Sequence, residues 1–163
     1  GPGLFKAVAT ALAVSVETLD IDPELQPDHV ASVFEMPFED GCYDVVCAFQ
    51  MLEHLPYEQS LVAFKEMCRV ANTHVVISLP DASRGWPQAL TIPKIGTINF
   101  YVPRPRLRPV EHKFDGEHYW EINKAGYPLK KIIADLIQSR EVELMKTFRT
   151  PENLYHRFFI FKV

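Results

Sequence analysis

The chain has 163 residues, of which 47% are hydrophobic and 23% charged, a balance typical of one folded domain. Its formal net charge of −4 argues against broad nucleic-acid binding by charge alone. No apolar run approaches the roughly 20 residues that a membrane span requires. We therefore expect a single domain over residues 1–163, with neither a nucleic-acid nor a membrane partner.

The three cysteines, Cys42, Cys47 and Cys68, lie in or beside segments that we expect to be buried. Their spacing matches no metal-ligand pattern, so we predict no metal site. An odd number of buried thiols suits a reducing compartment, and the first residues lack the charged start of a secretory signal. These features predict a cytoplasmic protein.

The first residues combine a glycine turn with a helix and a strand. Gly1 and Gly3 precede good helix formers over residues 4–13, and residues 15–21 form a strand candidate that ends in acid. This order is typical of the second half of a nucleotide-binding βαβ unit, where Asp20 would accept hydrogen bonds from a ribose diol. Alternatively, the acids here only end a strand and begin a turn.

Residues 43–80 form the clearest unit of the sequence. A strand buried on both faces is predicted over 43–49, an amphipathic helix over 58–70 and a second buried strand over 74–79. Such a βαβ unit has a right-handed crossover, and ligands bind beyond the carboxyl ends of its strands. We expect residues 49–51 and 80–81 at the rim of a site.

Four sequence blocks carry a family resemblance: Gly-Pro-Gly, LDIDPEL, MPFEDGCYDVV and AFQMLEHLPYEQSLVAFKEMCRV. In this order the chain resembles the class I S-adenosylmethionine-dependent methyltransferases over roughly residues 1–81. The resemblance implies an α/β fold with a three-layer Rossmann-like sheet, mostly parallel with an antiparallel C-terminal edge pair. It also implies methyl transfer from S-adenosylmethionine to a small-molecule acceptor.

The resemblance assigns eight residues to the cofactor. Gly1 and Gly3 would let the backbone approach the methionyl part of the cofactor. Asp20 would bind the ribose hydroxyls, and Ile21 would pack against the adenine. Ser32 and Val33 would meet the adenine ring, and Phe49 and Gln50 would line the sulfonium side. These residues are Gly1, Gly3, Asp20, Ile21, Ser32, Val33, Phe49 and Gln50.

Two departures from the family pattern leave other functions open. Ser32 stands where aspartate is usual, and the strand that normally precedes the glycines is missing, so we expect a fragment or a slot filled by another segment or a homodimer. A non-catalytic binding or scaffold module with an incomplete cofactor site is the alternative. A nicotinamide-dependent oxidoreductase would need Tyr-x-x-x-Lys, but Leu61 follows Tyr57 by four residues.

Residues 81–117 are rich in proline and basic residues, and we predict an irregular lid or insertion over the acceptor pocket. Arg104, Arg106 and Arg108 alternate through it. They either recognise an acidic acceptor or phosphate, or belong to an extended solvated strand, which is the interpretation that we favour.

Three histidines are candidate general bases, which an oxygen acceptor would need near neutral pH. They are His54, His112 and His118. His54 could instead cap the helix that begins near Pro56. Beside His118, Tyr119 and Trp120 either line the pocket or pack in the core. A helix over 128–138 and strands over 142–149 and 156–163 complete the prediction.

Overall fold

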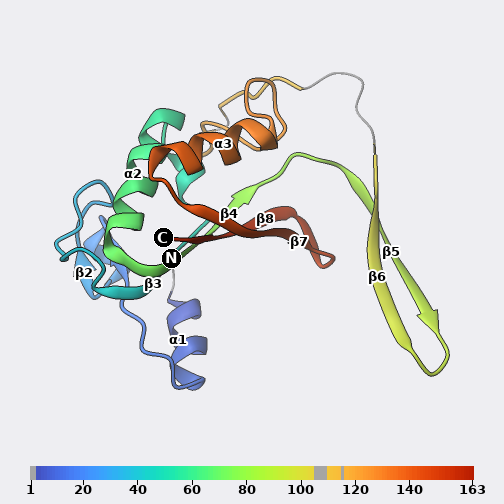
Figure 1. Cartoon of the computed structure of the whole chain (residues 1–163), viewed down its shortest axis with the longest axis horizontal. Helices are drawn as coiled ribbons and strands as arrows, with labels where there is room; N and C mark the ends of the chain where they lie inside the picture. Colours follow the sequence, from blue (N-terminus) through green and yellow to red (C-terminus); the bar gives the residue numbers. More distant parts are fainter. Residues whose placement is uncertain (1–2, 105–109, 115) are drawn as a thin grey trace.

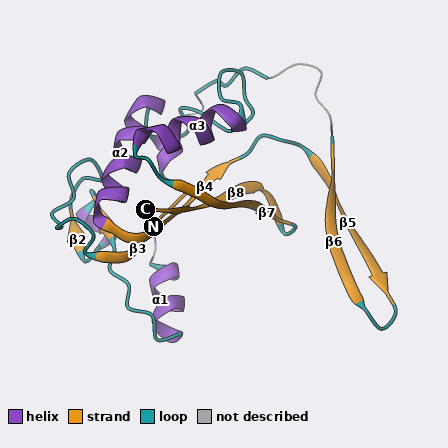
Figure 2. Cartoon of the chain, viewed as in Figure 1, coloured by secondary structure: helices purple, strands orange, loops and turns teal. Residues whose placement is uncertain are grey.

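A computed structural model describes residues 3–104, 110–114 and 116–163. These residues contain three α-helices, eight strands and two short 3-10 turns. Figures 1 and 2 show how the helices and strands are arranged. The helices and turns are α1 (Leu4–Ala11), η1 (Pro23–Leu25), η2 (Leu52–His54), α2 (Tyr57–Val70) and α3 (Leu129–Ser139). The strands are β1 (Leu19–Asp20), β2 (His29–Val30), β3 (Tyr43–Phe49), β4 (Ala71–Pro80), β5 (Gly85–Ile92), β6 (Gly96–Pro103), β7 (Glu143–Thr150) and β8 (Asn153–Lys162).

The βαβ unit predicted over residues 43–80 is confirmed. β3 and β4 pair in parallel, with Phe49 opposite Ser78, and α2 connects them. α2 buries Ala63, Phe64 and Met67 at spacings of one, three and four residues, which is the helical period that the sequence shows. The carboxyl ends of β3 and β4 therefore meet at one edge of the sheet.

The sheet that contains this unit is mixed. Its order is β3-β4-β8-β7, and both the β4–β8 and β7–β8 pairings are antiparallel. The predicted antiparallel C-terminal pair is confirmed, but the predicted mostly parallel sheet is wrong for the described strands. β1 and β2 form a separate two-stranded parallel sheet, because no described strand pairs with both β1 and β3.

β3 is far less buried than its apolar sequence predicts. Only Ala48 is buried, and 46% of Val45 is exposed. α1 contacts the end of the strand, where the rings of Phe5 and Phe49 lie 5.2 Å apart. Cys42 and Cys47 are exposed, so the expectation of buried thiols is wrong for them, whereas Cys68 on α2 is buried.

The core lies between the four-stranded sheet and the layer formed by α2 and α3 (Figure 1). The rings of Phe64 on α2 and Phe161 on β8 lie 5.1 Å apart. Trp120 is 1% exposed and its indole N–H donates to the carbonyl of Leu55, so it belongs to the core, while Tyr119 stays exposed. None of the described helices is long and apolar enough to cross a bilayer.

Residues 85–103 form a β-hairpin, so the expectation of an irregular segment is wrong there. β5 and β6 pair antiparallel and project from the body in Figure 1. The prolines that suggested irregular chain are tolerated because each strand of a two-stranded ribbon has a free edge that needs no donor. Arg106 and Arg108 lie outside the described residues.

Candidate functional site

A strained turn follows β3 at the edge where the strands end. Gln50 has a φ of 52°, in the left-handed region that residues other than glycine avoid. Its backbone N–H donates to both the carbonyl oxygen and Oγ of Ser78 on β4, at 3.2 Å each. Its side-chain amide also donates to Ser78 Oγ, at 3.2 Å. Strain of this kind persists where neighbouring contacts hold it, and it clusters at functional sites. The turn directs the chain into η2.

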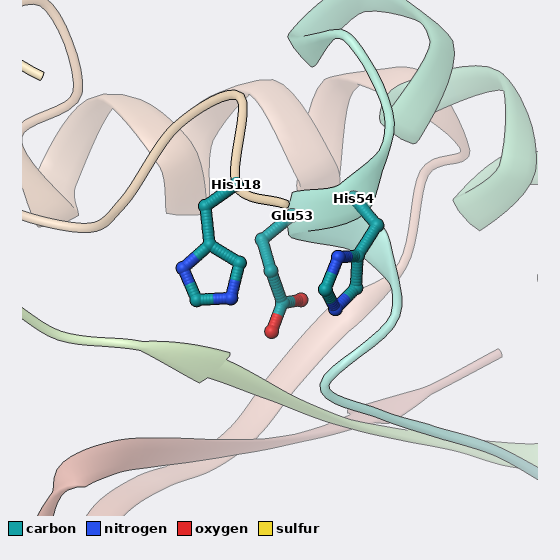
Figure 3. Close-up of side chains that lie close together, drawn as sticks. All are labelled: Glu53, His54 and His118. Atoms are coloured by element: carbon teal, nitrogen blue, oxygen red, sulfur yellow. The ribbon is translucent and has the colours of Figure 1, made fainter. Parts of the chain in front are cut away.

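η2 places Glu53 between two imidazoles, those of His54 and His118 (Figure 3). One potential metal-ligand atom of each side chain, a carboxylate oxygen or an imidazole nitrogen, lies within 4.8 Å of the other two. Glu53 is fully buried, and neither carboxylate oxygen receives a hydrogen bond from another described residue. A buried carboxylate without partners is costly unless a ligand or a proton satisfies it.

Hydrogen bonds hold the two segments of this cluster together. The backbone N–H of Tyr119 donates to the carbonyl of Glu53 at 2.9 Å. His54 Nδ1 lies 3.1 Å from the carbonyl of Glu117, which can only accept, so Nδ1 carries the proton. His54 Nε2 is then left with its lone pair, and the rings of His54 and His118 lie 5.1 Å apart.

The acidity of Glu53 suits proton transfer near neutral pH. Burial, with a smaller contribution from the nearby carboxylate of Glu121, raises the pKa of Glu53 to about 7. A carboxyl group with this pKa can hold or release a proton under ordinary conditions. A carboxylate with two imidazoles can also hold a divalent cation, so the expectation of no metal site stays a prediction.

His112 lies behind this cluster. Its side chain is 7% exposed, and Nε2 donates to the backbone carbonyl of His118 at 2.8 Å. Nδ1 lies 3.7 Å from a carboxylate oxygen of Glu121. The structure thus brings His54 and His118 together and places His112 where it supports the backbone of His118.

The residues assigned to the ribose and adenine lie around β1 and β2. Asp20 ends β1 opposite Val30, and its carboxylate accepts from the N–H of Asp22 at 3.0 Å. Ile21 is 73% exposed, and Ser32 Oγ accepts from a backbone N–H two residues on. Val33 packs against the core.

The glycine turn lies at the start of α1. Gly3 has a φ of 72°, and a Cβ built there meets no atom within 4 Å, so its backbone can be approached closely. Gly1 lies outside the described residues. The contact between Phe5 and Phe49 joins α1 to the end of β3, so Gly3 and Gln50 belong to the same side of the molecule.

The sequence prediction did not include Glu53, Arg149 or Arg157. The glutamate directly precedes His54 after a strand, which was a usable signal, but its burial is a tertiary property. Arg149 and Arg157 gave no signal, because only the β7–β8 register places them opposite each other.

The chain is similar to known methyltransferases in part of its sequence and in its fold. Residues 1–78 match the family model described as a methyltransferase domain. No curated protein matches the chain in sequence. A solved S-adenosylmethionine-dependent methyltransferase from Mesorhizobium loti shares 14% identity and a TM-score of 0.63, covering 100% of this chain and 87% of that one.

Two further solved structures are similar in fold. A protein from Pyrococcus horikoshii shares 12% identity and a TM-score of 0.63, covering 99% of this chain and 77% of that one. The 1,6-didemethyltoxoflavin-N1-methyltransferase from Burkholderia thailandensis shares 11% identity and a TM-score of 0.63, covering 99% and 67%. The first 78 residues therefore match a methyltransferase-domain model, and the chain shares the fold of these three solved structures.

Proposed function

We propose that this protein transfers a methyl group from S-adenosylmethionine to a small-molecule acceptor. The observation that carries the proposal is the convergence of the strained Gln50 turn and the Glu53–His54–His118 cluster at the edge where β3 and β4 end. Bound S-adenosylmethionine supplies an electrophilic methyl group, so the protein mainly has to align the acceptor and manage its proton. The Burkholderia thailandensis structure, which holds 1,6-didemethyltoxoflavin, supports a small-molecule acceptor.

The predicted cofactor residues fit the group that they would hold. The open space at Gly3 admits close backbone contact, and Asp20 presents a partly exposed carboxylate at the end of β1. We assign the ribose to Asp20, the adenine to Ile21, Ser32 and Val33, and the methionyl part to Gly1, Gly3, Phe49 and Gln50. We further propose that the two sheets belong to one three-layer Rossmann-like sheet, and that the free thiols indicate a cytoplasmic location.

Proton transfer falls to the two histidines. His54 donates through Nδ1 to the carbonyl of Glu117, which fixes its tautomer and leaves Nε2 to accept a proton from the acceptor group. His118 lies within ring contact of His54. Glu53 between them stabilises whichever imidazole becomes positively charged.

Calorimetric titration with S-adenosylhomocysteine tests the cofactor site. Asp20→Ala should weaken binding by about 1.5–3 kcal/mol, because a charged acceptor of hydrogen bonds is lost. Asp22→Ala is the matched control, since that carboxylate caps η1 by accepting from Glu24. Equal affinities of Asp20→Ala and the control would remove Asp20 from the site.

One observation favours a second candidate, a binding or scaffold module. Within the described residues, β1–β2 and β3-β4-β8-β7 are separate sheets, and the predicted cofactor residues are divided between them. A second copy of the chain that pairs between β1 and β3 would join them. If the same titration shows no binding of S-adenosylhomocysteine, this second candidate is favoured.

A further inference from the structure

A cavity of about 570 Å³ opens beyond the carboxyl end of β4, between the base of the β5–β6 hairpin and the start of α3. Its volume suits a small molecule. Among the described residues that line it, five are basic and none is acidic, although acids outnumber bases 21 to 17 in the whole chain. The basic residues are Arg84, Arg104, Lys124, Arg149 and Arg157.

Two of these arginines lie opposite each other. Arg149 on β7 pairs with Arg157 on β8, and like charges in directly opposed positions repel. Asp81 sits between them and accepts from Arg157 Nε at 2.7 Å, but its carboxylate is 3.9 Å from Arg149 Nε. One carboxylate thus serves two guanidinium groups.

Arg149 is held in place without a full set of partners. Its side chain is 2% exposed, and Nη1 donates to the carbonyls of Ser83 and Leu154 at 3.0 Å each. Its guanidinium carbon lies 4.5 Å from the ring centre of Tyr101. Nε is buried and has no hydrogen-bond partner among the described residues. A buried charged donor of this kind is costly unless an anion satisfies it.

The other basic residues add charge at the mouth of the cavity. The backbone N–H of Arg104 donates to the carbonyl of Arg84 at 2.9 Å, so these two exposed residues stand side by side. No ion pair joins either of them to an acid in the part of the chain that the structure describes. Lys124 has one distant partner, a Glu121 oxygen at 4.0 Å.

We propose that this cavity binds a carboxylate or phosphate group of the methyl acceptor. Arginine forks match both oxyanions and bind them through paired hydrogen bonds. The inference rests on the proposed function, because the acceptor must also reach His118. Residues 118–124 link His118 to Lys124 at the cavity, and the six residue-to-residue steps span at most about 20 Å.

The same segment fixes the cavity relative to the Glu53–His54–His118 cluster. Tyr119 donates to the carbonyl of Glu53, and Ile122 donates to the carbonyl of Pro80 at 3.0 Å, so the segment is bonded to both η2 and the end of β4. The cavity and His118 therefore lie at the two ends of one hydrogen-bonded segment.

Calorimetric titration of the full chain with pyrophosphate and with succinate, at constant ionic strength, tests the proposal. The double variant R84Q/R104Q changes only exposed side chains and should raise the dissociation constant at least tenfold. Lys130→Gln with Arg140→Gln on α3 and its end is the control with the same charge change. The control pair should bind both anions as the wild-type chain does.

Tighter binding of pyrophosphate identifies a phosphate group, and tighter binding of succinate identifies a carboxylate. Absence of binding to the wild-type chain, or equal loss in the control pair, overturns the proposal. A parallel titration with S-adenosylhomocysteine distinguishes failure of the anion site from failure of the proposed methyl transfer. Cofactor binding without anion binding removes only the anion site, whereas anion binding without cofactor binding keeps the anion site and removes methyl transfer.

Discussion

Asp81→Asn should lower the free energy of unfolding by about 3–5 kcal/mol, the cost of removing one partner of a buried ion pair. Asp81 is 1% exposed, and its carboxylate accepts from Arg157 Nε, the N–H of Ser83 and the amide of Asn123. The substitution keeps the shape of the side chain but leaves two guanidinium groups without an anion. Denaturant unfolding measures the loss.

The acid dependence of stability follows from the same contacts. Burial raises the pKa of Asp81, but hydrogen bonds from Arg157, Ser83 and Asn123 outweigh burial and hold this pKa below the ordinary value. The ionised form therefore stabilises the fold fully above the unfolded pKa of about 4, and this contribution is lost as the pH falls through the folded pKa. The difference between wild type and Asp81→Asn should shrink below about pH 4.

Asp40→Asn is the matched control for this prediction. Asp40 also pairs with an arginine, at 2.7 Å from Arg69, but its side chain is 77% exposed. Exposed ion pairs contribute about 0–1 kcal/mol. A loss in Asp81→Asn no larger than that in Asp40→Asn would show that the buried network does not stabilise the fold.

His118→Ala should lower the rate of methyl transfer about 10²- to 10⁴-fold and leave the affinity for S-adenosylhomocysteine unchanged. His118 would act with His54 in moving the proton of the acceptor beside Glu53, and it makes no part of the predicted cofactor site. Single-turnover transfer of a labelled methyl group to an acceptor chosen from the anion titrations measures the rate.

His74→Ala is the control for His118→Ala, because His74 lies near the start of β4, at the opposite end from the cluster. An equal loss of rate and cofactor affinity, or a loss as large in His74→Ala, would return His118 to a structural role. Glu53→Gln adds an independent measurement, since it should also change the pH dependence of the rate near neutrality by removing a carboxyl group with a pKa of about 7.

The sequence predicts those parts of the fold whose period is visible locally. The β3–α2–β4 unit and the C-terminal pair of strands follow from apolar runs and a helical stripe, and both are confirmed. The hairpin at 85–103 was missed because proline is read as a breaker, although a two-stranded ribbon tolerates it. The exposure of Val45 could not be predicted, because an apolar run does not say what covers it.

The site divides in the same way. His54 and His118 were candidates by residue type alone, and their ring contact confirms only that they lie together. Glu53 acquires its raised pKa from burial by the core, and the pairing of Arg149 with Arg157 depends on strand register. Both properties come from residues distant in sequence, so no local pattern contains them.

The left-handed backbone at Gln50 has a consequence for engineering this protein. Glycine adopts a φ of 52° without strain, whereas other residues carry about 1–3 kcal/mol there. Selection for heat resistance alone should therefore favour Gln50→Gly early. The substitution also deletes the side-chain amide bonded to Ser78 beside the proposed methionyl contact, so selected variants should gain robustness and lose activity, a trade-off located at one position.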